Sequence, residues 1–566
     1  MEPRPWHRFY EPEIPATGEY LDLTLHQILQ MATEEHPRGL ATIFVGAKLD
    51  YAGLGRRVDA FADALAGLGV RKGDRVALIL PNFPGYPIAH FAVAKLGGIL
   101  VPTNPLYVER ELEHQLNDSG AETVVILDRL FGTLKKVLPN TDVRRVIVLS
   151  IRDFLPRLLG LLYGLKNKSP VGDDAAAGIH LYRTLVKKRW PRHPGTHVST
   201  DDTAMLLYTG GTTGLSKGAE LTHRNVIVNV QQTRNWLWSM ADKREVLLCV
   251  LPFFHSYGMT TGMHLSVIAQ SAMLLLPRFE LADVAKAIKR HRPTIFCAVP
   301  SMYNALNRYP GLTPSDVSSI KLCVSGGAAL PAEVQKRFEE RTGGRLVEGY
   351  GLTETSPVVI VNPLMGQRKN GTIGIPIADT DARIVDLDTG EPAGPGEVGE
   401  LALKGPQVMK GYWNRPDETA GALRGGWFHT GDMAEMDEDG YFRIVDRKKD
   451  VIISAGMNVY PREVEEVLHQ HPKIVEAAVV GKPSKVREEI VKAFVVVEKG
   501  EELTKAEIVD FCRDKLSKFK IPKQVEIVDT LPKSALGKVL KRVLTETEPA
   551  AAERGPISGD GKSGPA

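Results

Sequence analysis

The residues Arg75-Val76-Ala77-Leu78-Ile79-Leu80 decide the fold class, because this short apolar run predicts a buried strand inside a repeating pattern. Apolar residues at helical spacing precede it from Tyr51 to Leu68 and follow it from Pro87 to Leu96. The alternation continues with a short apolar run, a polar helix and a strand at 99–101, 109–117 and 123–127. Alternating strands and helices predict βαβ units and a mostly parallel sheet, with ligands beyond the strand C-termini.

A loop rich in glycine and threonine follows another apolar run, Ala204 to Tyr208, which we expect to be a buried strand. Glycine lets the backbone approach a ligand closely, and N–H groups and threonine hydroxyls donate hydrogen bonds to phosphate oxygens. An amphipathic segment from about Thr222 predicts a strand, loop and helix in succession. The loop is not a Walker A motif, because Ser216 precedes the lysine and Gly218 follows it. The predicted phosphate cradle consists of Thr209, Gly210, Gly211, Thr212, Thr213, Gly214 and Lys217.

Length and composition bound the class of protein. A chain of 566 residues is too long for one ordinary core, so we expect two or three domains. The charged fraction is 25%, and 71 Lys and Arg against 68 Asp and Glu leave a net charge of +3, which does not indicate nucleic acid as a partner. The four cysteines show no CxxC spacing, which is typical of reduced, buried thiols in a cytoplasmic protein.

The N-terminus lacks the apolar core of a signal peptide, and no apolar run approaches the roughly 20 residues that span a bilayer, so we expect no integral membrane protein. The segment Asp153 to Lys168 is rich in leucine and basic at its end. Two interpretations stay open: it lies on the inner face of an anionic membrane, or it packs on its own domain. Pro156, Gly160 and Gly164 argue against one long helix.

Two sites in the middle of the chain carry weaker signals. His255 follows the predicted strand Val246 to Leu251 and lies among aromatic residues, where a packing role competes with a functional one. The predicted strand Lys321 to Val324 leads into Gly326, Gly327 and Ala328, where the backbone of a turn before a helix can face a flat ligand.

The stretch Glu348 to Thr355 brings an aromatic ring, a hydroxyl and a carboxylate within a few residues. Tyr350 can stack on a base, and Glu354 can hold Mg²⁺, which usually binds through one or two carboxylates beside phosphates. The region from Gly371 to Gly411 is rich in Gly, Pro and short Val/Ile/Leu runs, and it predicts a small antiparallel β subdomain.

The chain then changes character. Asp432 follows a Thr-Gly turn and is placed to accept hydrogen bonds from a ribose diol. Two interpretations of Arg447 stay open: it also binds the ribose, or it belongs to an exposed charged turn. A compact α/β unit follows, with predicted segments 462–468, 474–480, 491–497 and 505–516. We therefore expect an N-terminal domain at 1–446, a hinge at 447–450, a C-terminal domain at 451–545 and a disordered tail at 546–566.

Together and in this order, the motifs resemble the adenylate-forming enzymes, which include acyl-CoA synthetases, firefly luciferase and peptide-synthetase adenylation domains. The resemblance covers almost the whole chain and is closest to bacterial long-chain fatty-acid-CoA ligases at 103–111, 426–449 and 459–461. It implies an α/β fold: a large N-terminal domain of mixed and parallel sheets with helices and a small β subdomain, and a smaller, mobile α+β C-terminal domain.

The resemblance also implies roles for the matching residues toward ATP. The loop Thr209 to Lys217 would hold the β- and γ-phosphates. The adenine would lie between the backbone of Gly326, Gly327 and Ala328 and the ring of Tyr350, with Gly351 beside it. For the rest of the nucleotide, the implied residues are Thr353 at the α-phosphate, Glu354 at Mg²⁺, and Asp432 and Arg447 at the ribose.

Four further residues match motifs of the reaction. Lys538 resembles the adenylation lysine and Lys449 the hinge residue, while His255 resembles the residue beside the acyl carboxylate and Gly456 the glycine beside the pantetheine tunnel. The implied reaction joins a fatty acid to AMP with release of pyrophosphate, and then transfers the acyl group to CoA. Alternatives are a fatty-acyl-AMP ligase that loads a carrier protein, a medium-chain or aryl-CoA ligase, and a non-catalytic acyl-nucleotide sensor; a homodimer is also kept open.

Overall fold

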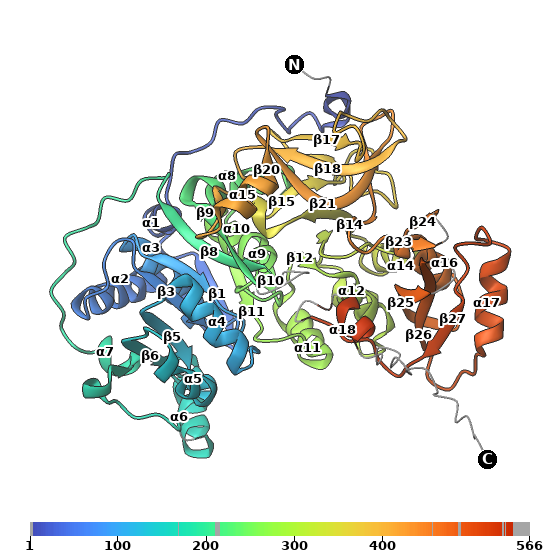
Figure 1. The fold of residues 1–566 in the computed structure, drawn as a ribbon. Coiled ribbons are helices and arrows are strands. Elements are labelled where there is room, and N and C mark those ends of the chain that lie inside the picture. Colours follow the sequence, from blue (N-terminus) through green and yellow to red (C-terminus); the bar gives the residue numbers. More distant parts are fainter. Residues whose placement is uncertain are drawn as a thin grey trace, which may run out of the picture. The chain divides into compact units, whose positions relative to one another are not determined.

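The computed structural model describes residues 4–167, 169–209, 216–240, 242–454, 457–484, 488–534, 537 and 539–546. The chain divides into two compact units, Met1–Val445 and Asp446–Ala566, and each is described by itself. Figure 1 shows the elements of both units.

A nine-stranded sheet forms one half of the larger unit. It is parallel in the middle and antiparallel at both ends. This confirms the prediction of a mostly parallel α/β sheet. In spatial order its strands are β16 (Ile375–Pro376), β15 (Val358–Val361), β14 (Arg345–Gly351), β13 (Leu322–Ser325), β12 (Ile295–Ala298), β10 (Val246–Cys249), β11 (Ala272–Leu275), β1 (Leu40–Phe44) and β2 (Ala47–Asp50).

An eight-stranded sheet forms the other half, and its strands from β8 to β7 run parallel. The run Arg75–Ile79 is β3, a central strand with four buried residues in succession, as its sequence predicts. In spatial order the strands are β19 (Gly411–Tyr412), β9 (Lys217–Thr222), β8 (Thr203–Thr209), β4 (Ile99–Pro102), β3, β5 (Thr123–Leu127), β6 (Arg145–Leu149) and β7 (Ile179–Leu181).

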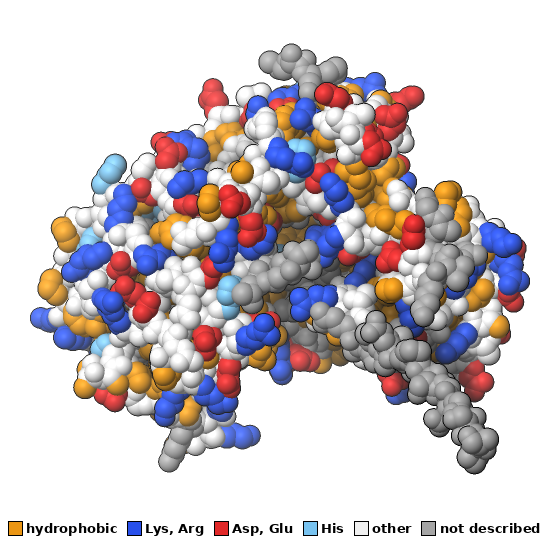
Figure 2. Space-filling model, in the orientation of Figure 1, with side chains coloured by type: hydrophobic (Ala, Val, Ile, Leu, Met, Phe, Trp, Pro, Cys, Tyr) orange, Lys and Arg blue, Asp and Glu red, His pale blue; other side chains and the backbone are white. Residues whose placement is uncertain are grey.

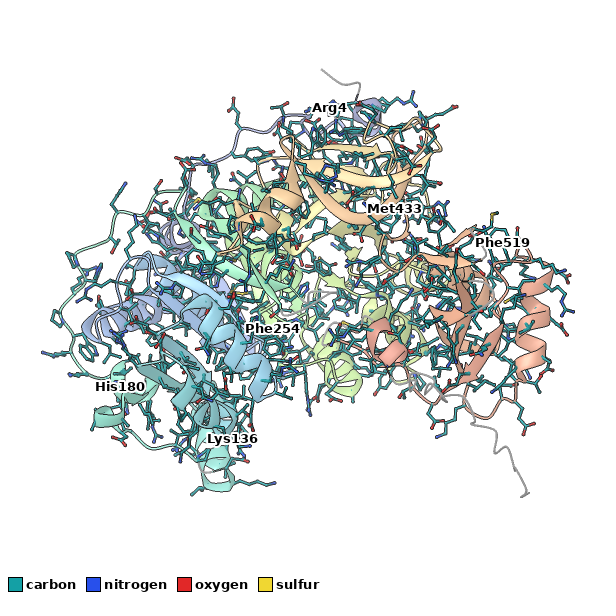
Figure 3. The ribbon with its side chains drawn as sticks, in the orientation of Figure 1. Arg4, Lys136, His180, Phe254, Met433 and Phe519 are labelled. Carbon is teal, nitrogen blue, oxygen red and sulfur yellow. The ribbon has the colours of Figure 1, made fainter. Side chains whose placement is uncertain are left out.

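The predicted small β subdomain is present but extends further along the chain than 371–411. Its five strands are β17 (Asp381–Val385), β18 (Val398–Lys404), β20 (Leu423–Arg424), β21 (Trp427–Met436) and β22 (Phe442–Arg447). The first four pair antiparallel, and β22 pairs with β21. The N-terminal segment contacts this subdomain, because Arg4, labelled in Figure 3, donates to the Asp381 carboxylate; the two atoms lie 2.6 Å apart.

Helices of the larger unit cover the sheets (Figure 1). Side-chain caps fix several starts: Asp50 accepts from Gly53 N–H at the start of α2, and Thr222 accepts from Asn225 N–H at the start of α8. The helices are α1 (Leu25–Glu35), α2 (Tyr51–Gly67), α3 (Gly85–Lys95), α4 (Glu109–Ser119), α5 (Phe131–Val137), α6 (Arg157–Lys166), α7 (Tyr182–Leu185), α8 (His223–Trp236), α9 (Ser256–Gly258), α10 (Leu265–Ile268), α11 (Leu281–His291), α12 (Pro300–Arg308), α13 (Pro314–Val317), α14 (Ala332–Thr342) and α15 (Pro416–Ala422).

The predicted succession of strand, loop and helix around the phosphate loop is wrong. The chain leaves β8 at Thr209, returns antiparallel as β9 from Lys217, and enters α8 only at His223. Thr209 and Lys217 are direct partners in the ladder, so the loop is the tip of a β-hairpin. The strand between the loop and the helix was not predicted, because Lys217–Thr222 is too polar to indicate a strand, although four of its residues are buried.

A pair of buried histidines joins α3 to a π-helix, Met259–His264. Their Nε2 atoms lie 3.0 Å apart, and both side chains are fully buried. Burial lowers the pKa of His264 to about 3 and holds the pKa of His90 well below its ordinary value. Both rings are therefore neutral near pH 7, and one donates to the other.

The smaller unit has its own five-stranded sheet and core. Its strands are β23 (Ile452–Ser454), β24 (Met457–Val459), β25 (Ile474–Ser484), β26 (Glu488–Val497) and β27 (Gln524–Ile527). Its helices are α16 (Pro461–His469), α17 (Lys505–Arg513) and α18 (Lys541–Glu546). Glu546 ends α18, so only 547–566 remain of the predicted disordered tail, and they lie outside the described residues.

Helix α6 exposes most of its leucines. The exposed fractions are 70% for Leu158, 58% for Leu161, 55% for Leu162 and 78% for Leu165. Within the described part of the chain, no helix has the length and apolar character needed to cross a membrane.

Candidate functional site

Lys217 at the start of β9 contacts one charged and one aromatic residue. Lys217, the first residue of β9, pairs with the carboxylate of Glu418 in α15. Its Nζ also lies 5.4 Å from the centre of the Tyr412 ring. Of the predicted phosphate cradle, Thr209 and Lys217 are therefore placed by the ladder, while 210–214 lie outside the described residues.

A hydrogen-bonded triad supports β8 next to the loop end of the β8–β9 hairpin. The Tyr208 hydroxyl donates to Asp118 Oδ2 over 2.7 Å, and Arg415 donates to Asp118 Oδ1 over 2.7 Å. Burial, and next the hydrogen bond to Asp118, raise the pKa of Tyr208 well above its ordinary value, so the phenol stays a neutral donor. The triad ties β8 to α4 and to the chain just before α15.

The glycine turn after β13 lies against Tyr257. Gly326 is buried and donates its N–H to Ala298 over 3.1 Å, and a Cβ there would lie 3.1 Å from the Tyr257 ring. Gly327 has a φ of +79°, which favours glycine, and Gly327 and Ala328 are exposed. The turn therefore exposes backbone atoms, against which a flat ligand can pack.

Tyr350 and Asp432 meet across two sheets. The Tyr350 hydroxyl donates to Asp432 Oδ2 over 2.5 Å, and the Asp432 side chain on β21 is only 4% exposed. Figure 3 labels Met433, the next residue of the same strand. The structure therefore brings the predicted base-stacking ring and the predicted ribose carboxylate into direct contact. Gly351 follows at the end of β14, where a Cβ would come within 2.0 Å of the Pro357 carbonyl oxygen.

Thr353 and Glu354 lie in the short 3₁₀ helix that follows β14. Glu354 is 9% exposed, and its Oε1 accepts a hydrogen bond of 2.9 Å from the Tyr412 hydroxyl. Among the described residues no group of three His, Cys, Asp or Glu side chains gathers as a metal cage. A single oriented carboxylate fits Mg²⁺, which takes one or two protein carboxylates, water and substrate phosphates.

His255 is half-buried just before α9, and its Nδ1 accepts from the Tyr257 N–H over 3.2 Å. This ring caps the helix and is not part of the core, which argues against a packing role. Figure 3 labels Phe254, the residue before it, in the middle of the larger unit.

The remaining predicted residues belong to the smaller unit. The Arg447 N–H donates to Asp446 Oδ1 over 2.7 Å, and Lys449 lies 3.9 Å from the Asp450 carboxylate. Gly456 and Lys538 lie outside the described residues.

Several residues beside the predicted site had no signal in the sequence. Tyr412 contacts Glu354, and Glu418 contacts Lys217. Asp118 and Arg415 hold Tyr208, the residue before Thr209. Only the fold brings these residues to the predicted ones. Tyr412 belongs to a strand of two residues, which is too short to show periodicity.

Two family models match the chain. Residues 29–413 match the AMP-binding enzyme family, and 463–538 match the AMP-binding enzyme C-terminal domain. The first match alone covers well over half of the 566 residues.

Curated relatives and a solved structure match over nearly the full length. The long-chain-fatty-acid–CoA ligase of Bacillus subtilis is 44% identical, over 96% of this chain and 98% of that relative. The ligase of the same name from Yersinia pestis is 41% identical, over 96% and 98%. The ATP-bound structure of MatB from Rhodopseudomonas palustris is 31% identical, with a TM-score of 0.82, over 93% of this chain and 99% of that one. The chain therefore belongs to the AMP-binding enzyme family and is an acyl-CoA synthetase, an acid–thiol ligase, of the adenylate-forming superfamily.

Proposed function

We propose that this enzyme activates a long-chain fatty acid with ATP and transfers the acyl group to CoA. The observation that carries the proposal is the match, over 96% of the chain, to the long-chain-fatty-acid–CoA ligase of Bacillus subtilis. The partly buried hydrogen bond between Tyr350 and Asp432 supports the nucleotide part of the proposal, because it gives a ring and a carboxylate one fixed geometry.

In this proposal the larger unit holds most of ATP. The hairpin tip from Thr209 to Lys217 binds the β- and γ-phosphates, and Thr353 binds the α-phosphate. The adenine lies against the exposed backbone of Gly327 and Ala328, next to the buried Gly326, and against Tyr350 and Gly351. Asp432 accepts hydrogen bonds from the ribose, and Arg447 is the second residue proposed to bind the ribose.

Glu354 is the proposed ligand of Mg²⁺. The ion, when bound, neutralises charge that develops on the phosphates as pyrophosphate leaves. The protein's part is to present a buried carboxylate in one orientation, which the hydrogen bond from Tyr412 provides. Lys538 is the proposed second source of positive charge at the α-phosphate.

The chemistry explains why no general base is needed for the first step. A fatty acid is ionised at pH 7, since carboxyl pKa values are roughly 4 to 5. Its oxygen bonds to the α-phosphorus, and the bond to the bridging oxygen breaks with its electron pair on pyrophosphate. In the second step the CoA sulfur bonds to the acyl carbon, AMP leaves with the bonding pair, and the thiol proton passes to solvent.

His255 is proposed to lie beside the acyl carboxylate, and Gly456 beside the pantetheine arm of CoA. Lys449 is the proposed hinge about which 451–545 would move, so that Lys538 gives way to the thiol after adenylation. The half-buried position of His255, on a helix cap instead of in the core, supports its part of the proposal.

The test compares carboxylic acids from acetate to oleate, together with aryl acids. We expect pyrophosphate release and CoA thioester formation with the long-chain acids, and little with acetate or aryl acids. Pyrophosphate release without a CoA thioester would favour a fatty-acyl-AMP ligase that loads a carrier protein. A preference for medium-chain or aryl acids would replace the long-chain assignment, and nucleotide binding without pyrophosphate release would favour a sensor.

We also propose that the enzyme works in the cytoplasm and contacts the membrane through Asp153 to Lys168. Four leucines of α6 are more than half exposed, and the residues from 154 to 172 contain no Asp or Glu. Lys135 of α5 and Lys166 of α6 are both exposed. Figure 2 shows basic side chains beside hydrophobic ones along the lower edge of the larger unit, where Figure 1 places α5 and α6 and Figure 3 labels Lys136. Apolar and basic groups together suit an anionic lipid surface.

The membrane contact is tested by co-sedimentation with vesicles of phosphatidylglycerol or of phosphatidylcholine. We expect the wild type to sediment with the anionic vesicles, and a variant with Leu158, Leu161 and Leu165 changed to Ser to stay in solution. Leu387→Ser is the matched control, because this leucine is 47% exposed and lies in the β subdomain. Unchanged sedimentation of the triple variant would contradict the proposal. A homodimer is a separate proposal, which light scattering of the purified enzyme checks.

A further inference from the structure

The segment from Met409 to Trp413 connects two parts of the site that are distant in sequence. Met409 N–H donates to the Glu354 carbonyl over 2.8 Å, and Trp413 N–H donates to Gly218 in β9 over 2.8 Å. Between them, β19 pairs antiparallel with β9, with Tyr412 opposite Ala219. One short strand therefore fixes the distance between the helix that carries Glu354 and the strand that begins at Lys217.

The side chain of Tyr412 reaches both functional groups. Its hydroxyl donates to Glu354 Oε1 over 2.9 Å, and the Lys217 Nζ lies 5.4 Å from its ring centre. Its backbone is anchored as well, because its N–H donates to the Thr419 hydroxyl in α15 over 2.9 Å. Tyr412 is therefore held at its backbone by Thr419 and at its side chain by Glu354 and Lys217.

The phenol hydroxyl is the donor in this contact, and the Glu354 carboxylate oxygen is the acceptor. Each carboxylate oxygen has two lone pairs, so accepting this hydrogen bond is compatible with binding a cation through the same carboxylate.

We propose that Tyr412 is a positioning residue for the adenylation step: its hydroxyl orients Glu354 toward the metal of Mg·ATP, and its ring holds Lys217 near the phosphates. The proposal rests on the function proposed above. Hydrogen-bond partners that orient a metal ligand typically change metal affinity about 10- to 100-fold when they are removed. The ring contributes separately, since a lysine over an aromatic face is attracted whether or not the hydroxyl is present.

The experiment measures metal and nucleotide binding apart from turnover. α,β-Methylene-ATP cannot release pyrophosphate, and Mn²⁺ in its complex with the enzyme is counted by electron paramagnetic resonance. For Tyr412→Phe we expect the Mn²⁺ concentration at half-saturation to rise about 10- to 100-fold. For Tyr412→Leu, which also removes the ring, we expect an additional loss of affinity for the nucleotide.

Tyr441→Phe is the matched control. Its hydroxyl donates to the Gln367 carbonyl over 2.6 Å, and Lys369 lies 4.7 Å from its ring centre, so the same two interactions occur away from the site. We expect this variant to bind Mn²⁺ within about twofold of the wild type. Tryptophan fluorescence at increasing urea shows that each variant is folded.

The outcomes separate this proposal from the proposed function. If Tyr412→Phe is folded and binds Mn²⁺ as the wild type does, the role of the hydroxyl is overturned. If the Leu and Phe variants bind nucleotide equally well, the role of the ring is overturned. A wild type that binds Mn²⁺ with the analogue but forms no acyl-CoA would instead count against the proposed function.

Discussion

The buried pair of His90 and His264 predicts how the larger unit loses stability in acid. An unfolded histidine has a pKa of about 6.5, whereas burial lowers the pKa of His264 to about 3 and that of His90 well below its ordinary value. Between the folded and unfolded pKa values the unfolded chain binds more protons. Stability therefore falls as the pH falls below about 6.5.

The size of the effect follows from linkage. Each histidine that stays neutral in the folded state costs about 1.4 kcal/mol per pH unit below its unfolded pKa. The pair therefore gives a limiting slope of about 2.7 kcal/mol per pH unit and costs about 2.8 kcal/mol at pH 5.5. No charged side chain contributes to either shift, because the causes are burial and, for His90, the neighbouring rings of His264 and His223.

The assay is urea unfolding followed by tryptophan fluorescence from pH 7.5 to pH 5. It reports on one unit only, because all six tryptophans (Trp6, Trp190, Trp236, Trp238, Trp413 and Trp427) lie before the boundary at Val445. The comparison is with the double variant His90→Gln and His264→Gln. Its two side-chain amides can still form a hydrogen bond with each other, and neither of them titrates.

In acid, we expect the free energy of unfolding of the double variant to depend on pH less steeply than that of the wild type, by about 2.7 kcal/mol per pH unit. The other titrating groups are the same in both proteins, so their contributions cancel in the difference. His197→Gln is the control, since that histidine is exposed, and its slope should match the wild type. Equal slopes for the double variant and the wild type would refute the reasoning that the pair is neutral and buried.

Two further predictions concern one lysine and the four cysteines. Lys538→Ala should lose most adenylation, because charge at the α-phosphate is no longer neutralised, yet it should still convert supplied acyl-adenylate and CoA to thioester; equal loss of both half-reactions would rule out two conformations. The thiols of Cys249, Cys297, Cys323 and Cys512 are all buried, and burial raises the pKa of each, so a disulfide reagent should label none within minutes until urea is added. Rapid labelling of the native protein would contradict that burial.

Much of the fold could be predicted because local pattern and tertiary environment agree. The runs at Arg75 and Thr123 are short, continuous and apolar, as strands buried on both faces must be, and helical spacing separates them. Strand β9 was not predicted, because Lys217–Thr222 has a polar composition and is buried only by the elements around it. The β8–β9 hairpin therefore follows from the structure and not from the sequence pattern.

The candidate site divides in the same way. Motif residues such as Tyr350 and Asp432 were predicted one by one, but their hydrogen bond joins positions 82 residues apart. Tyr412 lies 58 residues from Glu354 and has no pattern of its own, since a two-residue strand exists only because β9 is beside it. Contacts of this kind depend on the order of the strands in the sheets, which the local sequence pattern does not reveal.

The ends of the two large sheets have a consequence for how copies of this enzyme can associate. The eight-stranded sheet ends in β19 and β7, of two and three residues, and the nine-stranded sheet ends in β16 and β2, of two and four. One of these, β16, ends in Pro376, which has no N–H to donate. Such short edges offer almost no free ladder to a second chain. The two large sheets are therefore protected against edge-to-edge aggregation, and we do not expect copies of the enzyme to associate through a continuous ladder at these edges.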